Sequence, residues 1–249
     1  PELDMSVRTL YSYLDQGLFT ARNIDLKRKV HFKPRKCHKT QITDRTVFTN
    51  RLYRDFCSLA LTSYVQMDTV YSSRESKKTL LTMFFTKEKL FLAFLMNRCT
   101  KGAVRLVFDR LEKRMGTYEF ASVFEYILTD RGSEFGDPDA LETGVNGIQR
   151  SSIYYCDPMQ SGQKGGLEQA HTMLRMILPK GTCFEFLTQW DVNLIVNHIN
   201  STPRESLDGK TPYSVALETL GEEVLNAFQL RPIAPDEVNL TPKLIRFNH

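Results

Sequence analysis

Three acidic residues, Asp68, Asp130 and Glu168, are the strongest candidates for chemistry in this 249-residue chain. Asp68 and Asp130 each follow an apolar run, over residues 63–67 and 124–129. A strand that ends on Asp can present its carboxylate at a sheet edge, beside the Asp of a neighbouring strand. Carboxylates gathered in this way repel one another, and a divalent cation with oxygen ligands is the usual compensation, as in phosphoryl-transfer sites. We therefore predict a divalent metal site.

Glu168 is the acid whose placement is most informative. The stretch 153–181 predicts a strand, a turn at Asp157-Pro158, a glycine-rich loop and a helix that Pro179 ends, so Glu168 falls in the first helical turn. A first-turn Glu can also serve only to complement the helix dipole. The order Asp, Asp, Glu, with 37 residues between the last two, favours the metal site.

The elements that must position these acids form a mixed α/β pattern. Short charged links separate the first three strand-like runs, which predicts an antiparallel meander, and a helix is expected over 101–115. The order β-β-β-α-β-α-β-α is that of a ribonuclease-H-like fold. The expected strands cover residues 63–70, 79–86, 90–97, 123–129 and 152–156.

Further helices are expected on both sides of this pattern. Ser6 can cap a short amphipathic helix that carries Arg8 on its polar face. Aromatic residues at helical spacing predict a lead-in helix over 44–61. Two helices are expected near the end of the chain, one over 186–200 with Trp190 available for packing and one that begins at Pro212.

Positive charge is concentrated in residues 22–45. This segment holds nine Lys or Arg and two Asp, a balance of +7 in a chain whose total is +4. Such an arm is typical of a segment that follows DNA phosphates, although a solvated linker is the alternative. Its expected DNA contacts are Lys27, Arg28, Lys29, Lys33, Arg35 and Lys36.

Composition indicates a cytoplasmic protein with one core and an appendage. Hydrophobic residues make up 41% and charged residues 25% of the chain, and no apolar run approaches the ~20 residues that span a bilayer. We expect no contact with a membrane. Five widely spaced cysteines without a C-x-x-C pair argue against a disulfide framework and a zinc ribbon.

Five strings of residues, in order, resemble the integrase core of bacterial insertion-sequence transposases of the IS-thirty family. The resemblance is close over about residues 68–214 and looser at the flanks. The chain departs from the family pattern at Arg131, Gly162, Leu167 and Gln169. The strings are 67–70 (MDTV), 128–135 (LTDRGSEF), 155–168 (YCDP, QKG and the final Glu), 178–182 (LPKGT) and 200–212 (NSTPRESLDGKTP).

The resemblance implies a layout as well as a fold. The fold is expected to be a retroviral-integrase-like mixed sheet of five strands with helices on both faces. Because the chain begins at Pro1, we expect residues 1–18 to be the end of a truncated helix-turn-helix domain. Residues 19–60 would then be the basic linker and lead-in helix, 61–222 the catalytic core and 223–249 a C-terminal tail.

The implied activity is that of a DDE transposase, which cleaves the ends of an insertion sequence and joins them to target DNA. Two Mg²⁺ or Mn²⁺ ions are expected, with Asp68 bridging both, Asp130 holding one and Glu168 the other. The implied partners are double-stranded DNA, as transposon ends and target, and at least one further copy of the chain. The implied location is the bacterial nucleoid. No nucleotide cofactor is expected.

Residues near the acids are further candidates for DNA contact. Arg131, Gln163, Lys164 and His171 are expected there, with a bond from Arg131 to Glu134 as an alternative. Three other acids compete for roles: Glu134 on a loop, expected to be solvated unless it reaches the site, Asp157 as a turn residue and Asp109 on a helix surface.

Two other functions share parts of this pattern. A nuclease that only hydrolyses would use the same acids, but it would not need the basic arm or the helix at Ser6. A domesticated DNA-binding protein would keep the arm and should have lost an acid. All three acids are present, which favours the transposase.

Overall fold

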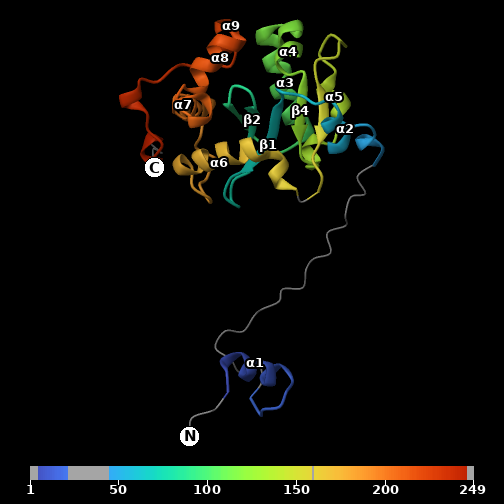
Figure 1. The fold of residues 1–249 in the computed structure, drawn as a ribbon, viewed down its shortest axis with the longest axis vertical. Coiled ribbons are helices and arrows are strands. Elements are labelled where there is room, and N and C mark those ends of the chain that lie inside the picture. Colours follow the sequence, from blue (N-terminus) through green and yellow to red (C-terminus); the bar gives the residue numbers. More distant parts are fainter. Residues whose placement is uncertain (1–4, 22–44, 159, 246–249) are drawn as a thin grey trace. The chain divides into compact units, whose positions relative to one another are not determined.

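The computed structural model describes residues 5–21, 45–158 and 160–245 (Figure 1). The chain forms two compact units, Pro1–Ile42 and Thr43–His249. In the first unit, α1 (Val7–Asp15) begins where the sequence predicts, because the Ser6 hydroxyl accepts a hydrogen bond from the Thr9 N–H at 3.1 Å. Arg8 is exposed on this helix.

The second unit is built on a sheet of five strands in the order β3-β2-β1-β4-β5. β1, β2 and β3 pair antiparallel, whereas β4 and β5 run parallel to β1. This order and these directions are those of a ribonuclease-H-like fold, as predicted. The strands are β1 (Val65–Tyr71), β2 (Thr79–Phe85), β3 (Leu90–Met96), β4 (Tyr126–Thr129) and β5 (Ser152–Tyr155).

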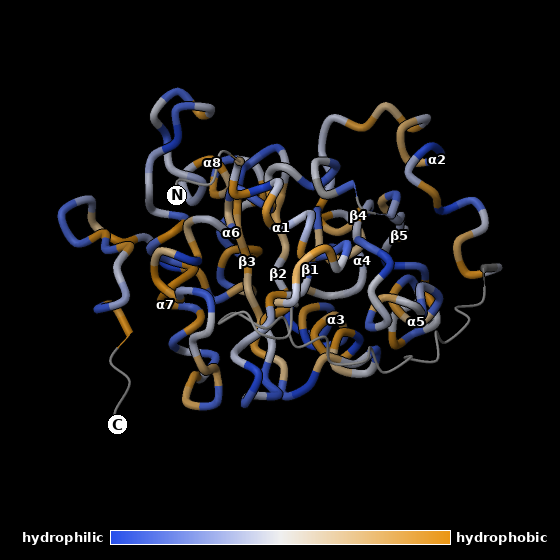
Figure 2. Tube along the Cα trace, turned by 90° about the horizontal axis from the view of Figure 1, so that it is seen from below, coloured by the Kyte–Doolittle hydropathy of each residue, from blue (hydrophilic) through white to orange (hydrophobic). Residues whose placement is uncertain are grey.

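Helices cover both faces of the sheet, and the alternation of side chains along the strands assigns each helix to a face. Phe84 lies against α6 (Gly165–Ile177), since a Cβ on Gly166 would touch its ring. Phe85 points to the other face, where its ring contacts Phe124 and Phe228. Hydrophobic residues are concentrated along the inner strands and helices (Figure 2). The remaining longer helices are α3 (Lys101–Met115), α7 (Gln189–Asn200) and α8 (Pro212–Leu220).

The lead-in segment differs from the single helix expected over 44–61. It forms a 3-10 turn, Arg45–Phe48, and a separate short helix, α2 (Tyr53–Ser58). Between them Asn50 has a positive φ of 59°, and Leu52 forms a bridge with Tyr155 of β5. The regularly spaced aromatic residues therefore belong to two short elements at the edge of the sheet. Both elements are part of the compact unit that contains the core.

The starts of one strand and one helix also differ from prediction. The strand expected from residue 123 begins at Tyr126, because the preceding residues form α4 (Thr117–Val123), which buries Phe120. α7 begins at Gln189 instead of 186, where Thr188 and Asp191 form a capping box. Trp190 lies on the solvent side and is 70% exposed, so it does not pack as expected.

The outer edge of β3 is occupied by side-chain amides from α7. Asn200 accepts a hydrogen bond from the Phe91 N–H at 2.9 Å and donates one to the Phe91 carbonyl at 2.7 Å. Gln189 accepts from the Leu95 N–H and donates to the Ala93 carbonyl. These four bonds use backbone groups that would otherwise be open at a sheet edge.

The C-terminal segment contacts the core at several of its described residues. A short helix, α9 (Glu222–Ala227), is followed by irregular chain, and Phe228, Leu230 and Ile245 are all buried in the core. In the described part of the chain, none of the helices has the length and apolar character needed to cross a membrane.

Candidate active site

The parallel pairing of β1 with β4 brings Asp68 and Asp130 to one level of the sheet. Val65 lies opposite Ile127 and Gln66 opposite Leu128, so the same register two residues further along places the two aspartates side by side. Asp130 directly follows β4, as predicted. Asp68 lies inside β1 and not at its end, because pairing with β2 continues to Tyr71.

A lysine ammonium lies between these two carboxylates. Lys164 Nζ is 3.1 Å from Asp68 Oδ2 and 3.5 Å from Asp130 Oδ2, and it donates to the Met67 carbonyl at 3.3 Å. The lysine side chain is only 7% exposed. Lys164 was expected on the loop surface as a DNA contact, but it points into the site.

Glu168 lies in the first turn of α6, as predicted, and is exposed. The negative charges of Asp68 and Glu168 both act to raise the pKa of His171, so both carboxylates lie near it. Among the described residues, no three His, Cys, Asp or Glu side chains form a group that could hold one metal ion. Of the three predicted acids, Asp68 and Asp130 are the two that form ion pairs with the Lys164 ammonium.

The donor set nevertheless fits a divalent cation. Mg²⁺ and Mn²⁺ prefer carboxylate oxygens, and two such oxygens already converge on one cationic group, the Lys164 ammonium. Asp68 and Asp130 would hold the cation from the sheet, and Glu168 would contribute from α6.

Burial raises the pKa of Asp130. The Lys164 ammonium opposes this effect, while the charges of Asp68 and Glu134 add to it. Glu134 was expected to be solvated, yet it is buried in a 3-10 turn, where Tyr71 Oη donates to it at 3.4 Å. A Cβ on Gly132 would lie 2.7 Å from Glu134 Oε2 and 3.0 Å from Asp130 Oδ1, so the two carboxylates flank this glycine.

His171 ties α6 to the sheet and is half-buried, and its expected contact with DNA stays a prediction. Its Nε2 lies 2.8 Å from Thr82 Oγ1, and that hydroxyl donates to the Asp68 carbonyl at 3.1 Å. Since the hydroxyl proton is used there, we assign the proton of the second bond to His171 Nε2. Burial lowers the His171 pKa, although the charge of Asp68 raises it.

Arg131 and Gln163, two further candidates for DNA contact, both bind the turn after β5. Arg131 Nε donates to the Cys156 carbonyl at 3.1 Å, and its guanidinium lies 5.2 Å from the Phe48 ring centroid. The Gln163 amide forms two hydrogen bonds with Asp157, at 2.8 and 3.1 Å. Asp157 thus holds the loop, in agreement with its expected role as a turn residue.

Close packing at the start of α6 fixes the height of Glu168 above the sheet. Gly166 lies against the Phe84 ring, and the Leu167 N–H donates to Gln66 Oε1 at 2.9 Å. The sequence analysis did not identify Gln66 or Phe84. A buried polar residue on a central strand, Gln66, was the available signal.

The basic residues expected to follow DNA, Lys27, Arg28, Lys29, Lys33, Arg35 and Lys36, lie outside the described residues. Their roles remain predictions.

Comparison with curated proteins finds transposases. The chain is 33% identical over 88 residues to the transposase InsI of insertion sequence element IS30A of Escherichia coli K12, over 34% of this chain and 21% of that protein. It is 34% identical over 100 residues to the transposase of IS1086 of Cupriavidus metallidurans, covering 40% and 28%. The chain is related to IS30-type insertion-sequence transposases. The comparison thus supports the resemblance drawn from the five strings.

A longer match is to a viral protein described as a putative integrase. A putative integrase, ORF3, of Spiroplasma virus SpV1-R8A2 B is 23% identical over 205 residues, which cover 81% of this chain and 60% of that protein. The matched parts span between 21% and 60% of these relatives' own lengths. No family model matches the chain.

Solved structures similar to this chain include integrase catalytic cores. The core of BIV integrase covers 63% of this chain at 22% identity with a TM-score of 0.43, and 94% of that core is matched. The HTLV-2 integrase core in complex with magnesium covers 61% at 16% identity with a TM-score of 0.45, again with 94% of that core matched. The fold assignment here rests on the strand order and directions.

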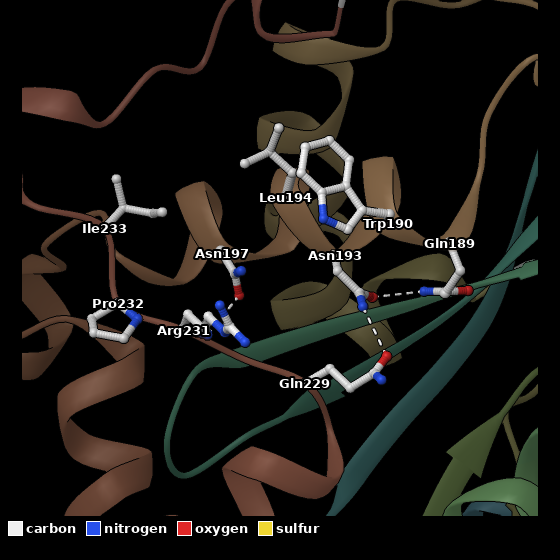
Figure 3. Close-up of a pocket in the computed structure, with 9 residues that line it drawn as sticks. All are labelled: Gln189, Trp190, Asn193, Leu194, Asn197, Gln229, Arg231, Pro232 and Ile233. Atoms are coloured by element: carbon white, nitrogen blue, oxygen red, sulfur yellow. Dashed lines mark hydrogen bonds between the residues drawn. The ribbon is translucent and has the colours of Figure 1, made fainter.

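A pocket of about 540 Å³ lies between α7 and the chain that follows α9 (Figure 3). α7 supplies one wall, with Trp190 exposed, and residues 229–233 supply the other. A chain of amides runs along it, from Gln189 to Asn193 and on to Gln229. None of the three acids lines this pocket, so we do not place the chemistry there.

Proposed function

We propose that this chain carries the catalytic core of a DDE transposase, which cleaves DNA at insertion-sequence ends and joins the ends to target DNA. The observation that carries the proposal is the pairing of Asp68 and Asp130 at one level of adjacent parallel strands, with both carboxylates directed at one cation. The fold, Glu168 on the neighbouring helix and the IS30-type relatives support it.

The proposed chemistry needs carboxylates that position cations, and little else from the protein. Asp68 and Asp130 would each direct one oxygen at the shared site, and Glu168 would complete the set of ligands. When bound, divalent cations activate the attacking oxygen and stabilise the leaving oxygen of phosphoryl transfer. Water is the attacking group in the first step, and the freed 3′-hydroxyl is the attacking group in the second.

The proposed partners are double-stranded DNA and further copies of this chain. The basic segment 22–45 would bind phosphates outside the core, as its charge predicts. Arg8 on α1 is exposed and free to contribute. Assembly into at least a dimer is part of the proposal, because the two ends of one element must be held together while each is joined to target DNA.

Neutral variants of the three acids test this function. Asp68→Asn, Asp130→Asn and Glu168→Gln remove a ligand charge at nearly constant volume, so each should lower cleavage and strand joining by at least about a hundredfold. The assay would follow a labelled end duplex and a target plasmid in Mg²⁺ and in Mn²⁺.

Asp236→Asn, which removes an exposed acid far along the chain, is the matched control and should keep full activity. Circular dichroism would confirm that each variant is folded. If the wild type cleaves the duplex but never joins the new 3′ end to a target, the protein is a hydrolytic nuclease. Near-normal activity in any of the three variants would remove that residue from the site.

A further inference from the structure

Lys164 has a role in this site that the sequence did not predict. We propose that Lys164 is an internal counter-ion of the Asp68–Asp130 pair, and that a divalent cation displaces its ammonium when it binds. The inference rests on the proposed metal-dependent function. It deepens that function by identifying the group that the metal ion must replace.

The ammonium is held between the two carboxylates by charge and by one hydrogen bond to the backbone. Lys164 Nζ donates a hydrogen bond to the Met67 carbonyl at 3.3 Å and forms ion pairs with Asp68 Oδ2 at 3.1 Å and Asp130 Oδ2 at 3.5 Å. With its side chain 7% exposed, Lys164 makes these contacts in place of contacts with water. In this position its charge is directed at the two aspartates and away from a DNA phosphate outside the site.

A divalent cation and this ammonium cannot share the site. Both would use the same two oxygens, Asp68 Oδ2 and Asp130 Oδ2. Two cations on one pair of oxygens would lie a few ångströms apart, where like charges repel strongly in a partly buried site. Binding of the divalent cation therefore requires Lys164 to withdraw.

The chain around Lys164 leaves room for that withdrawal. Lys164 is the last residue of a 3-10 turn, Ser161–Lys164, and the residue before α6. Gly162 and Gly165 lie on either side, and a Cβ added to either would meet no atom within 4 Å. Glycine also imposes the least restriction on the backbone.

The helix that carries Glu168 is anchored independently of Lys164. The Leu167 N–H is bonded to Gln66, and Gly166 packs on Phe84. Lys164 can thus turn outward while Glu168 keeps its place. The freed ammonium would then be available for an anion such as a DNA phosphate, which was its predicted role.

Amine labelling of the full chain tests the displacement without measuring activity. Acetylation of each lysine would be followed by mass spectrometry, with and without Mg²⁺ or Mn²⁺. Lys164 should react slowly without the divalent cation and at least tenfold faster at saturating concentration. Lys180, which is exposed, should react at one rate throughout. In an Asp68→Asn, Asp130→Asn double variant, Lys164 should lose its response to the metal.

Calorimetric titration of Mg²⁺ and Mn²⁺ gives a second readout. Lys164→Met removes the competing charge, so the divalent cation should bind at least tenfold more tightly than to the wild type. Lys164→Arg keeps a cation and should not show this gain. If Lys164→Met does not fold, the labelling result still decides the question.

The proposal is overturned if saturating Mg²⁺ and Mn²⁺ leave the Lys164 labelling rate unchanged, or if a folded Lys164→Met variant binds these ions no more tightly. If the protein gives either of these results and still joins DNA strands, the proposed function holds and only the displacement of Lys164 is refuted. Metal-dependent exposure of Lys164 in a protein that never cleaves or joins DNA would support the displacement and refute the proposed function.

Discussion

Arg150 Nη1 lies 2.7 Å from Glu112 Oε2, and neither side chain is more than 4% exposed. The same nitrogen is 2.7 Å from Asp109 Oδ1, and the guanidinium lies over the Phe108 and Phe120 rings. Arg150 Nε also donates to the Leu141 carbonyl at 2.8 Å. This arginine therefore joins α3 to the chain that enters β5, the strand that leads to the loop of Lys164.

Arg150→Met should destabilise the fold by about 3–5 kcal/mol, because it leaves the Glu112 carboxylate buried beside Asp109 without a cation. Urea unfolding at neutral pH would measure the loss. Lys210→Met is the control, since Lys210 forms an exposed ion pair with Glu218 at 3.0 Å and should change stability by less than about 1 kcal/mol. Equal effects of the two substitutions would contradict a structural role for the buried pair.

The loss in Arg150→Met should also depend on pH. Burial by itself would raise the pKa of Glu112, but hydrogen bonds from Thr117 and Arg150 outweigh it, and the net pKa is lowered. A lowered folded-state pKa contributes stability above the unfolded pKa of ~4.3, and this stability is lost as pH falls through the folded value. Unfolding at pH 3 should therefore show a smaller difference between variant and wild type than unfolding at pH 7.

Asp130→Asn should stabilise the protein when no divalent cation is added. The folded-state pKa of Asp130 is raised, so its charge costs stability as pH rises from the unfolded pKa of ~3.9 through the folded value. The gain should be below about 1 kcal/mol, or at most ~4 °C, because the Asp130 side chain is 46% exposed and its charge is screened.

Thermal melts from pH 3 to pH 8 would measure this gain, which should vanish below pH ~4. Adding Mg²⁺ should reverse the order, since only the wild type gains stability from binding. A wild type that melts above the variant at pH 7 without divalent cations would show that the attraction to Lys164 outweighs burial.

Gly166→Ala should destabilise the protein by about 1–3 kcal/mol and lower strand cleavage. The added methyl group would overlap the Phe84 ring, which is buried and can yield only by moving the core. α6 would then shift, and Glu168 with it. Gly162→Ala is the matched control: open space surrounds that position, so it should be neutral or stabilising by up to ~1 kcal/mol. Similar losses at both glycines would show that the close approach of α6 is unimportant.

Reversing the charges of Lys27, Arg28 and Lys29 should weaken the salt dependence of DNA binding. Each phosphate contact that is lost should lower the magnitude of the log-log slope by roughly 0.9. Binding to a duplex at several salt concentrations measures this slope. An unchanged slope would mean that the segment 22–45 acts only as a spacer.

Sequence patterns predicted the strands well, because short apolar runs separated by charged links are local features of the sequence. The three antiparallel strands, the helix over 101–115 and the first-turn position of Glu168 all agree with the structure. Aromatic runs were harder to interpret. Phe120 and Phe124 fit a strand or a helix equally well, and their stacking in the core, at 4.6 Å between ring centroids, selects the helix.

The direction of long polar side chains could not be predicted from their place in the sequence. Lys164, Arg131 and His171 all lie near the acids, but the structure uses them for internal contacts. A lysine on a glycine-rich loop is usually solvated, and only the pairing of β1 with β4 creates the two-carboxylate site that draws Lys164 inward. Such contacts between distant segments leave no local pattern.

The amides of Asn200 and Gln189 along β3 have a consequence for how copies of this chain can meet. An exposed strand edge invites another strand to add to it, which is a common route to runaway aggregation. Here four outward backbone groups are already bonded, namely the N–H and carbonyl of Phe91, the Ala93 carbonyl and the Leu95 N–H. Growth of the sheet from one molecule into the next is blocked on this side, so any ordered assembly that uses it must form through side chains.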